Sequence, residues 1–313
     1  MRARCCTLIW SAALLLAGCA SFDPAGYRAF QVAAAPAAAW AGQSWHGLPI
    51  ESGQIIVTEH TGATSLFLAL STADFTPYLH IGVIAIESGR PYVYEAMGAL
   101  LPMPWARPNA HVGGGVQRVT LDRFLARGGI FAIYDPPAGV DRRVLVEFAA
   151  TRWRERVPFD GRYDARDSSK YYCVEFVARA LEAAGSAPIR ATPVTRNPSL
   201  QVALQWLDIR TPELLMAGTI VAREQRVALI SRGLTVAQIE RYFVLKRELH
   251  RRFTPDQRLG NVMFWERQKL RLRPRVVEYF ETGIRSQTEP GILADRMFGP
   301  VPPPDERVAT AAP

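Results

Sequence analysis

The spacing of apolar and polar positions predicts short strands and helices that alternate between residues 46 and 195. Runs rich in β-branched and aromatic residues indicate strands, and they occur at Gln54 to Thr58, Leu79 to Ile86, Pro91 to Ala96, Val116 to Thr120 and Ile130 to Tyr134. Helical spacing covers Ala63 to Ser71, Val140 to Trp153 and Tyr171 to Gly185, and a short helix is expected before Gly128. This succession predicts an α+β fold in which a small mixed or antiparallel sheet packs on helices.

The pattern changes after Pro198. Helical spacing with many arginines runs through Leu204 to Leu215, Val236 to His250 and Arg258 to Glu281. We therefore expect residues 196–289 to form a helical extension rather than a second catalytic domain. Residues 290–313 are rich in proline and alanine, a composition typical of a disordered tail.

The first residues have the features of an export signal. Arg2 and Arg4 precede an apolar stretch from Leu8 to Ala17 that is too short to span a bilayer. The Leu-Ala-Gly sequence before Cys19 resembles the bacterial lipobox, which implies cleavage before Cys19 and attachment of lipid to that residue. The alternative is an ordinary secretory signal in which Cys19 is incidental. Residues 1–18 are thus predicted to be a lipoprotein signal peptide, and the alanine-rich residues 19–45 a tether.

A lipid at Cys19 would anchor the protein to a membrane of the cell envelope. Ala20, rather than an aspartate, follows the cysteine, and this favours the outer membrane with the protein facing the periplasm. Loss of Arg2 and Arg4 lowers the formal net charge from +8 to +6. A moderately basic exterior suits anionic lipids or cell-wall polymers, and no nucleic acid is expected as a partner of an exported protein.

Cys173 is the cysteine that remains as a thiol once the signal is removed and Cys19 carries lipid. It begins an apolar stripe at helical spacing that continues through Phe176 and Val177. If Ser168 or Ser169 caps the helix, Cys173 lies in the first turns, where the helix dipole favours a thiolate. The alternative is a small buried residue without a chemical role.

His80 opens a predicted strand at a position where an apolar residue is expected. If the hairpin turns on Ser88-Gly89 so that Glu87 faces Arg90, Glu95 lies diagonal to His80 on the same face, within reach of its side chain. A carboxylate there could bind one imidazole nitrogen and leave the other facing a nucleophile. A slip of one residue would place Glu95 on the opposite face, and a core histidine satisfied by a glutamate is the alternative.

Four segments carry a resemblance to a known family. They are Gln54-Ile55-Ile56, Tyr78-Leu79-His80-Ile81-Gly82-Val83, Tyr94-Glu95-Ala96 and Tyr171-Tyr172-Cys173-Val174-Glu175. Their order and spacing resemble the permuted papain-like group called YaeF/YiiX, which is related to NlpC-type cell-wall peptidases and to lecithin retinol acyltransferase. The resemblance covers about residues 50–190 and implies Cys173 as nucleophile, His80 as base and Glu95 as the orienting third member. Val174 departs from the pattern, because the family often has serine there.

The resemblance implies that residues 46–195 form a papain-like, NlpC-like catalytic domain. The expected function is an envelope cysteine hydrolase, an amidase or peptidase that forms a thioester, with peptidoglycan peptides as a natural substrate. Two alternatives stay open: a lipid esterase or acyltransferase with the same triad, and a lipoprotein that binds a ligand without catalysis.

Further residues are candidates for the site. Tyr78, Tyr172 and Glu175 are candidate substrate-binding residues, although Glu175 also fits a surface carboxylate. His60 and His111 are expected in loops, either solvated or facing substrate. We expect no metal and no cofactor, because the sequence has no Cys-x-x-Cys pair, no His-Glu-x-x-His motif and no glycine-rich phosphate loop.

Overall fold

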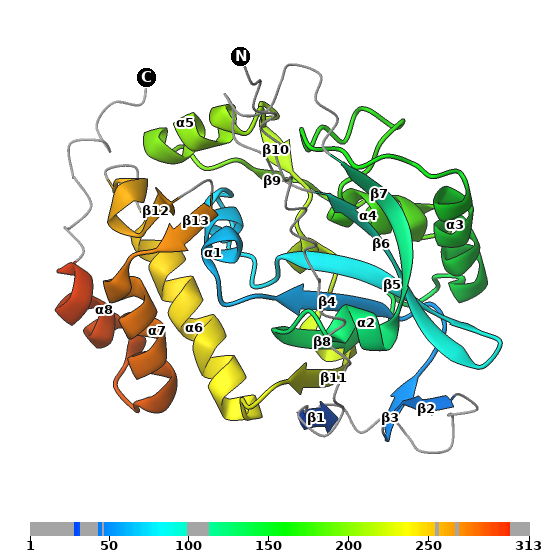
Figure 1. Cartoon of the computed structure of the whole chain (residues 1–313), viewed down its shortest axis with the longest axis horizontal. Coiled ribbons are helices and arrows are strands. Elements are labelled where there is room, and N and C mark those ends of the chain that lie inside the picture. Colours follow the sequence, from blue (N-terminus) through cyan, green and yellow to red (C-terminus); the bar gives the residue numbers. More distant parts are fainter. Residues whose placement is uncertain are drawn as a thin grey trace, which may run out of the picture.

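A seven-stranded sheet forms the centre of the protein, with the strand order β1-β11-β8-β4-β5-β6-β7 (Figure 1). The computed structural model describes residues 28–31, 43–45, 47–98, 113–253, 257–266 and 269–300. The strands are β1 (Arg28–Gln31), β4 (Ile55–Glu59), β5 (His80–Glu87), β6 (Arg90–Gly98), β7 (Gly114–Thr120), β8 (Ile130–Tyr134) and β11 (Arg226–Ser231). Every neighbouring pair in this sheet is antiparallel. The α+β fold predicted from the sequence is therefore confirmed.

The hairpin of β5 and β6 has the predicted register. Ser88 and Gly89 both have positive φ, 47° and 78°, as a tight turn between twisted strands requires. Glu87 consequently pairs with Arg90, and Val83 pairs with Tyr94.

Both faces of the sheet are covered. Successive side chains of a strand point to opposite sides, and those of β5 enter two different apolar clusters. Ile81 and Val83 join a large apolar cluster with residues of α1 (Ala63–Leu70), α3 (Arg142–Arg154) and α4 (Cys173–Ala183). Ile84 of β5 belongs to a second cluster with residues of α2 (Leu121–Leu125). The predicted stripe of α4 is buried, and Val174, Glu175 and Ala178 beside it are buried as well.

The segment after residue 196 is not the purely helical extension that the sequence indicated. Its elements are α5 (Pro198–Trp206), β10 (Glu213–Leu214), β11, α6 (Val236–Arg252), β12 (Met263–Glu266), β13 (Lys269–Leu272), α7 (Pro274–Arg285) and α8 (Pro290–Phe298). Strand β10 pairs with β9 (Thr192–Pro193), and β12 pairs with β13. Helical structure ends at Trp206 instead of Leu215, and a β-hairpin precedes α7 within the stretch from Arg258 to Glu281, where helical spacing interrupted by Pro274 was expected.

Strand β11 also changes the predicted domain boundary. It lies between β1 and β8 in the central sheet, so residues 46–195 do not form a complete folding unit. All six residues of β11 are buried. A short apolar run of this kind fits a buried strand or a buried helix, and periodicity does not separate the two.

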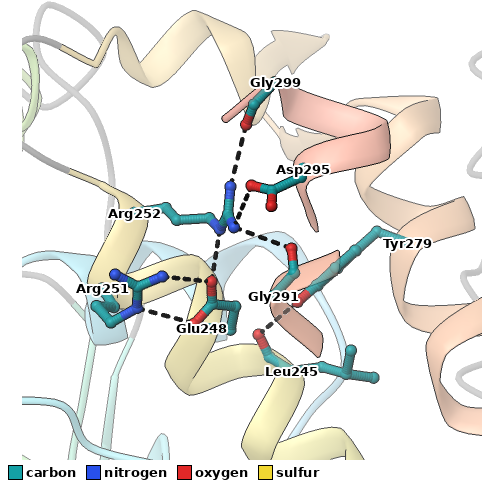
Figure 2. A network of polar contacts seen from close by, with 8 residues as sticks. All are labelled: Leu245, Glu248, Arg251, Arg252, Tyr279, Gly291, Asp295 and Gly299. Atoms are coloured by element: carbon teal, nitrogen blue, oxygen red, sulfur yellow. Dashed lines mark hydrogen bonds and ion pairs between the residues drawn. The ribbon is translucent and has the colours of Figure 1, made fainter. Parts of the chain in front are cut away.

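Residues 290–298 were expected in a disordered tail, but they form α8. Pro290 stands at the first helical position, which suits its fixed φ. Arg252 of α6 holds this helix: its guanidinium donates to the carboxylate of Asp295, to the carbonyl of Gly291 and to the carbonyl of Gly299 just beyond the helix (Figure 2). Residues 301–313 lie outside the described residues.

The predicted tether, residues 19–45, is structured in two places. β1 pairs with β11, and β2 (Gln43–Trp45) pairs with β3 (Leu48–Ile50). β1 forms the edge of the central sheet, and pairing with a free sheet edge is open to any extended segment, which explains why composition alone did not indicate this strand. Cys19 and the predicted signal peptide lie outside the described residues. Among the helices of the described ranges, none is both long and apolar enough to cross a bilayer.

Candidate active site

Cys173 is the first residue of α4. The predicted caps Ser168 and Ser169 are wrong, because these residues lie in a turn and Tyr172, which is extended, is the N-cap residue. The N–H of Tyr171 donates to the carbonyl of Pro158, and Tyr171 forms an isolated parallel β-bridge with Phe159. These contacts fix the residues just before α4. The thiol therefore lies closer to the positive end of the helix dipole than the sequence suggested. Cys173 is 7% exposed.

His80 and Glu95 are brought together from the two strands of the hairpin. Nε2 of His80 lies 2.5 Å from Oε2 of Glu95, so the diagonal contact predicted from the register is confirmed. His80 is buried and Glu95 is fully buried. The ring of Phe124 stacks on the imidazole, with the ring centroids 6.0 Å apart. These contacts fix the orientation of the ring.

Two further residues bind Glu95, and the sequence analysis missed both. Arg127 donates to both carboxylate oxygens, from Nη1 at 2.7 Å and from Nη2 at 2.6 Å. Gln117 donates to Oε1 at 2.9 Å from the neighbouring strand, where it pairs with Glu95. The register of β6 and β7 would have indicated Gln117. Arg127 follows α2 in a loop, and no pattern in the sequence points to it.

The interactions in the site favour a protonated His80 and an ionised Glu95. Burial by itself lowers the pKa of His80, but the charge of Cys173, a hydrogen bond to Cys173 and the contact with Glu95 outweigh it and raise that pKa to about 10. Burial by itself raises the pKa of Glu95, but His80 and Arg127 outweigh it and lower that pKa to about 2. An imidazolium between a carboxylate and a sulfur is the state that these interactions favour.

Cys173 and His80 open onto one cavity of about 760 Å³. Cys173 reaches it from α4, His80 from β5, Arg127 from the loop after α2, and His60 from the loop after β4. The apolar residues that line it are Ala63, Leu68, Leu79, Ala96, Met97, Phe124, Phe131, Phe159, Leu270, Leu272 and Val277. A compound with a sizeable apolar part would fit this volume.

The three candidate substrate-binding residues do not line this cavity. The hydroxyl of Tyr78 lies 2.7 Å from that of Tyr134 in the core. The hydroxyl of Tyr172 accepts a hydrogen bond from the N–H of Leu215 at 2.9 Å. Both tyrosines satisfy their polar ends inside the protein, as buried tyrosines usually do.

Glu175 is buried rather than a surface carboxylate. Its Oε1 lies 3.8 Å from Nε of Arg179, and neither oxygen has a hydrogen-bond partner within the described part of the chain. Burial raises the pKa of Glu175 to about 8, against the opposing charge of Arg179. The helical spacing placed this residue off the stripe, but the stretch of residues 158–171 covers the other side of α4.

The remaining histidines do not extend the catalytic group. His60 lines the cavity, and burial together with the positive charges of His80 and Arg127 lowers its pKa. Nε2 of His250 lies 3.0 Å from the carbonyl oxygen of Thr72. His46 and His111 lie outside the described residues. In the ranges that the structure describes, no group of three or more His, Cys, Asp or Glu side chains could hold a metal ion.

Comparison with solved structures shows a distant likeness. No protein-family model matches the chain, and no curated protein matches it either. Among solved structures, the chain is similar to the metalloprotein YiiX from Escherichia coli O157:H7, with a TM-score of 0.44 and 19% identity over 57% of this chain and 95% of that one. A likeness of this size assigns neither an activity nor a metal to the present chain.

Proposed function

We propose that the protein is a cysteine hydrolase of the permuted papain-like type, with Cys173 as nucleophile, His80 as base and Glu95 as the group that orients His80. The observation that carries the proposal is that Cys173 and His80 line the same cavity while Nε2 of His80 contacts the buried carboxylate of Glu95 behind it. A nucleophile, a base within reach and a third group that orients the base are the parts that acyl transfer needs.

The chemical steps follow from this arrangement. The proton of the Cys173 thiol is held by His80 before the substrate binds, and the thiolate attacks the carbonyl carbon of an amide or ester. The amine or alcohol leaves with the proton from His80, and a thioester remains on Cys173. Water then gives a proton to His80, its oxygen attacks the thioester, and the acid is released as the thiol re-forms.

The oxyanion of the tetrahedral intermediate needs hydrogen-bond donors. The first N–H groups of a helix have no partner inside the helix, and Cys173 is the first residue of α4. We infer that its backbone N–H is one such donor. Donors that are already in place stabilise developing charge without a cost of reorganisation.

For the substrate we propose an amide of the cell envelope, such as a peptidoglycan peptide, reached by a protein that is lipid-anchored through Cys19. The apolar lining favours a second candidate, an esterase or acyltransferase that acts on the acyl chain of a lipid with the same three residues. A lipoprotein that holds a ligand without turnover is the third candidate, and it requires no reactive thiol.

Thiol reactivity and product analysis test these proposals. Iodoacetamide should alkylate Cys173 in the folded wild type, mapped by mass spectrometry of its peptides, and much more slowly in His80→Gln. Purified protein should release products from muropeptides or fatty acid from phospholipid vesicles, and Cys173→Ala should release neither. A thiol that is inert in the native protein would favour the binding role. Fatty acid release with intact muropeptides would replace the amidase by the esterase.

A further inference from the structure

The C-terminal segment forms part of the wall of the cavity that contains Cys173. Leu270, Arg271 and Leu272 of β13 and Val277 of α7 line it together with Cys173 and His80. These residues lie outside the part of the chain in which the catalytic group was predicted. The segment therefore takes part in forming the cavity.

Buried contacts fix this segment to the core. Lys246 of α6 lies 2.9 Å from Oε1 of Glu59 in β4, and both side chains are buried. Ser65 of α1 accepts a hydrogen bond from Lys246 at 2.8 Å and donates one to Glu59 at 2.5 Å. Helix α7 packs on α6, and β13 packs on α1. The hairpin that carries Arg271 is thus held in place by α1, on which β13 packs, and by α6, which is joined to the core through Lys246.

Three cationic side chains line the cavity, Arg127, Arg271 and His80, and no aspartate or glutamate is among the described residues that do. His60 also lines it, with a lowered pKa. Arg127 is engaged by both oxygens of the buried Glu95. The cavity is therefore apolar over most of its wall and positive at particular points, which suits an amphiphilic anion.

Arg271 is the cation of this set that is most easily redirected to a ligand. Its Nε lies 3.4 Å from Oε2 of Glu266, and the two side chains are 54% and 56% exposed. Exposed ion pairs of this kind contribute about 0–1 kcal/mol, so a ligand anion can replace Glu266 at small cost.

We propose that Arg271 recognises an anionic group, a carboxylate or a phosphate, on a substrate whose apolar part occupies the cavity. That this ligand is a substrate rests on the proposed function, whereas its binding at Arg271 does not require turnover. The extension would then be a specificity element, and the enzyme would prefer acyl compounds that carry a negative charge.

Ligand binding to the full-length protein tests this directly. Decanoate and decan-1-ol have the same apolar chain, and their dissociation constants can be compared by calorimetry below the concentrations at which they aggregate. The wild type should bind decanoate about three to ten times more tightly, as a charge-assisted contact at a half-exposed arginine predicts. Arg271→Gln should remove this preference while leaving the affinity for decan-1-ol unchanged.

Lys269→Gln is the matched control. Lys269 is on the same strand and loses the same charge, but it does not line the cavity, so the preference for decanoate should persist. Decyl phosphate in a third arm distinguishes a phosphate from a carboxylate as the preferred group. Equal binding of decanoate and decan-1-ol by the wild type, or a preference that survives Arg271→Gln, would overturn the inference. Alkylation of Cys173 by iodoacetamide reports on the hydrolase proposal separately.

Discussion

Nε2 of His80 and Oε2 of Glu95 lie 2.5 Å apart, and the same carboxylate accepts two hydrogen bonds from Arg127. The carboxylate is thus held from two sides and cannot rotate away from the imidazole. A base whose ring is fixed in this way needs little reorganisation when it accepts a proton. Removal of either partner of Glu95 should therefore affect activity more than stability.

Glu95→Gln should lower kcat/KM by about 10²- to 10⁴-fold, the range found when the orienting carboxylate of a triad loses its charge. The amide can still contact His80, but it does not stabilise an imidazolium. The measurement is turnover of whichever substrate the wild type hydrolyses. Glu87→Gln is the control on the same hairpin, because Glu87 pairs with Arg118 and does not line the cavity. Equal losses in the two variants would contradict the assignment of Glu95.

Arg127→Gln should shift the acidic limb of the pH–rate profile to higher pH. The guanidinium is one cause of the pKa of Glu95 near 2, so its removal raises that pKa. Arg127→Lys should restore the profile only in part, because an ammonium does not make the two-pronged contact. Arg123→Gln, a loss of charge on the exposed side of α2, should leave the profile unchanged. An unchanged limb in Arg127→Gln would show that the arginine is structural.

The pKa of His80 should fall when Cys173 is replaced by alanine. The charge of Cys173 leads the interactions that raise this pKa to about 10. An NMR titration of the imidazole in the wild type and in Cys173→Ala, with His250 as an internal reference, measures the change.

Glu175→Gln should stabilise the protein at pH 8 and leave it nearly unchanged at pH 4.5. Burial raises the pKa of Glu175 to about 8, so the folded state retains a proton between pH 4.5 and 8, and wild-type stability decreases across that range. The melting temperature should rise by about 2–4 °C at pH 8, the shift expected for about 1 kcal/mol in a domain of this size. Glu147→Gln, at an exposed position of α3, should have no such pH dependence. A destabilised Glu175→Gln at pH 8 would indicate an unrecognised partner.

Lys246→Met should destabilise the protein by about 3–5 kcal/mol, because it leaves the buried carboxylate of Glu59 without its cation. The double variant Glu59→Gln with Lys246→Met should recover part of this loss. The free energy of unfolding from urea titration completes the double-mutant cycle. Arg251→Gln on the same helix removes an exposed partner of Glu248 and should cost no more than about 1 kcal/mol. Equal decreases in the free energy of unfolding for Lys246→Met and Arg251→Gln would show that the buried ion pair stabilises the protein no more than an exposed one.

The sequence predicted those parts of the site that depend on local pattern. The turn at Ser88-Gly89 determines the register of β5 and β6, and the register determines that Glu95 meets His80. The apolar stripe after Cys173 determines which side of α4 is buried. The catalytic roles of these residues stay predictions, because contact geometry alone does not test them.

The parts that the sequence did not predict depend on contacts between distant segments. Arg127 meets Glu95 across 32 residues from a loop. Arg271 reaches the cavity because α6 is fixed to β4 through a buried ion pair 187 residues apart, between Glu59 and Lys246. Helical spacing gives neither contact, because it describes one element at a time.

The position of β11 between β1 and β8 affects how the polypeptide is folded as it is synthesised. Until residues 226–231 have left the ribosome, the five-residue strand β8 presents one edge without its neighbour. An open apolar edge invites pairing with other chains, and long-range pairing of strands is slow. We therefore expect nascent chains that stop short of β11 to depend on chaperones, and the complete chain to acquire its native sheet late.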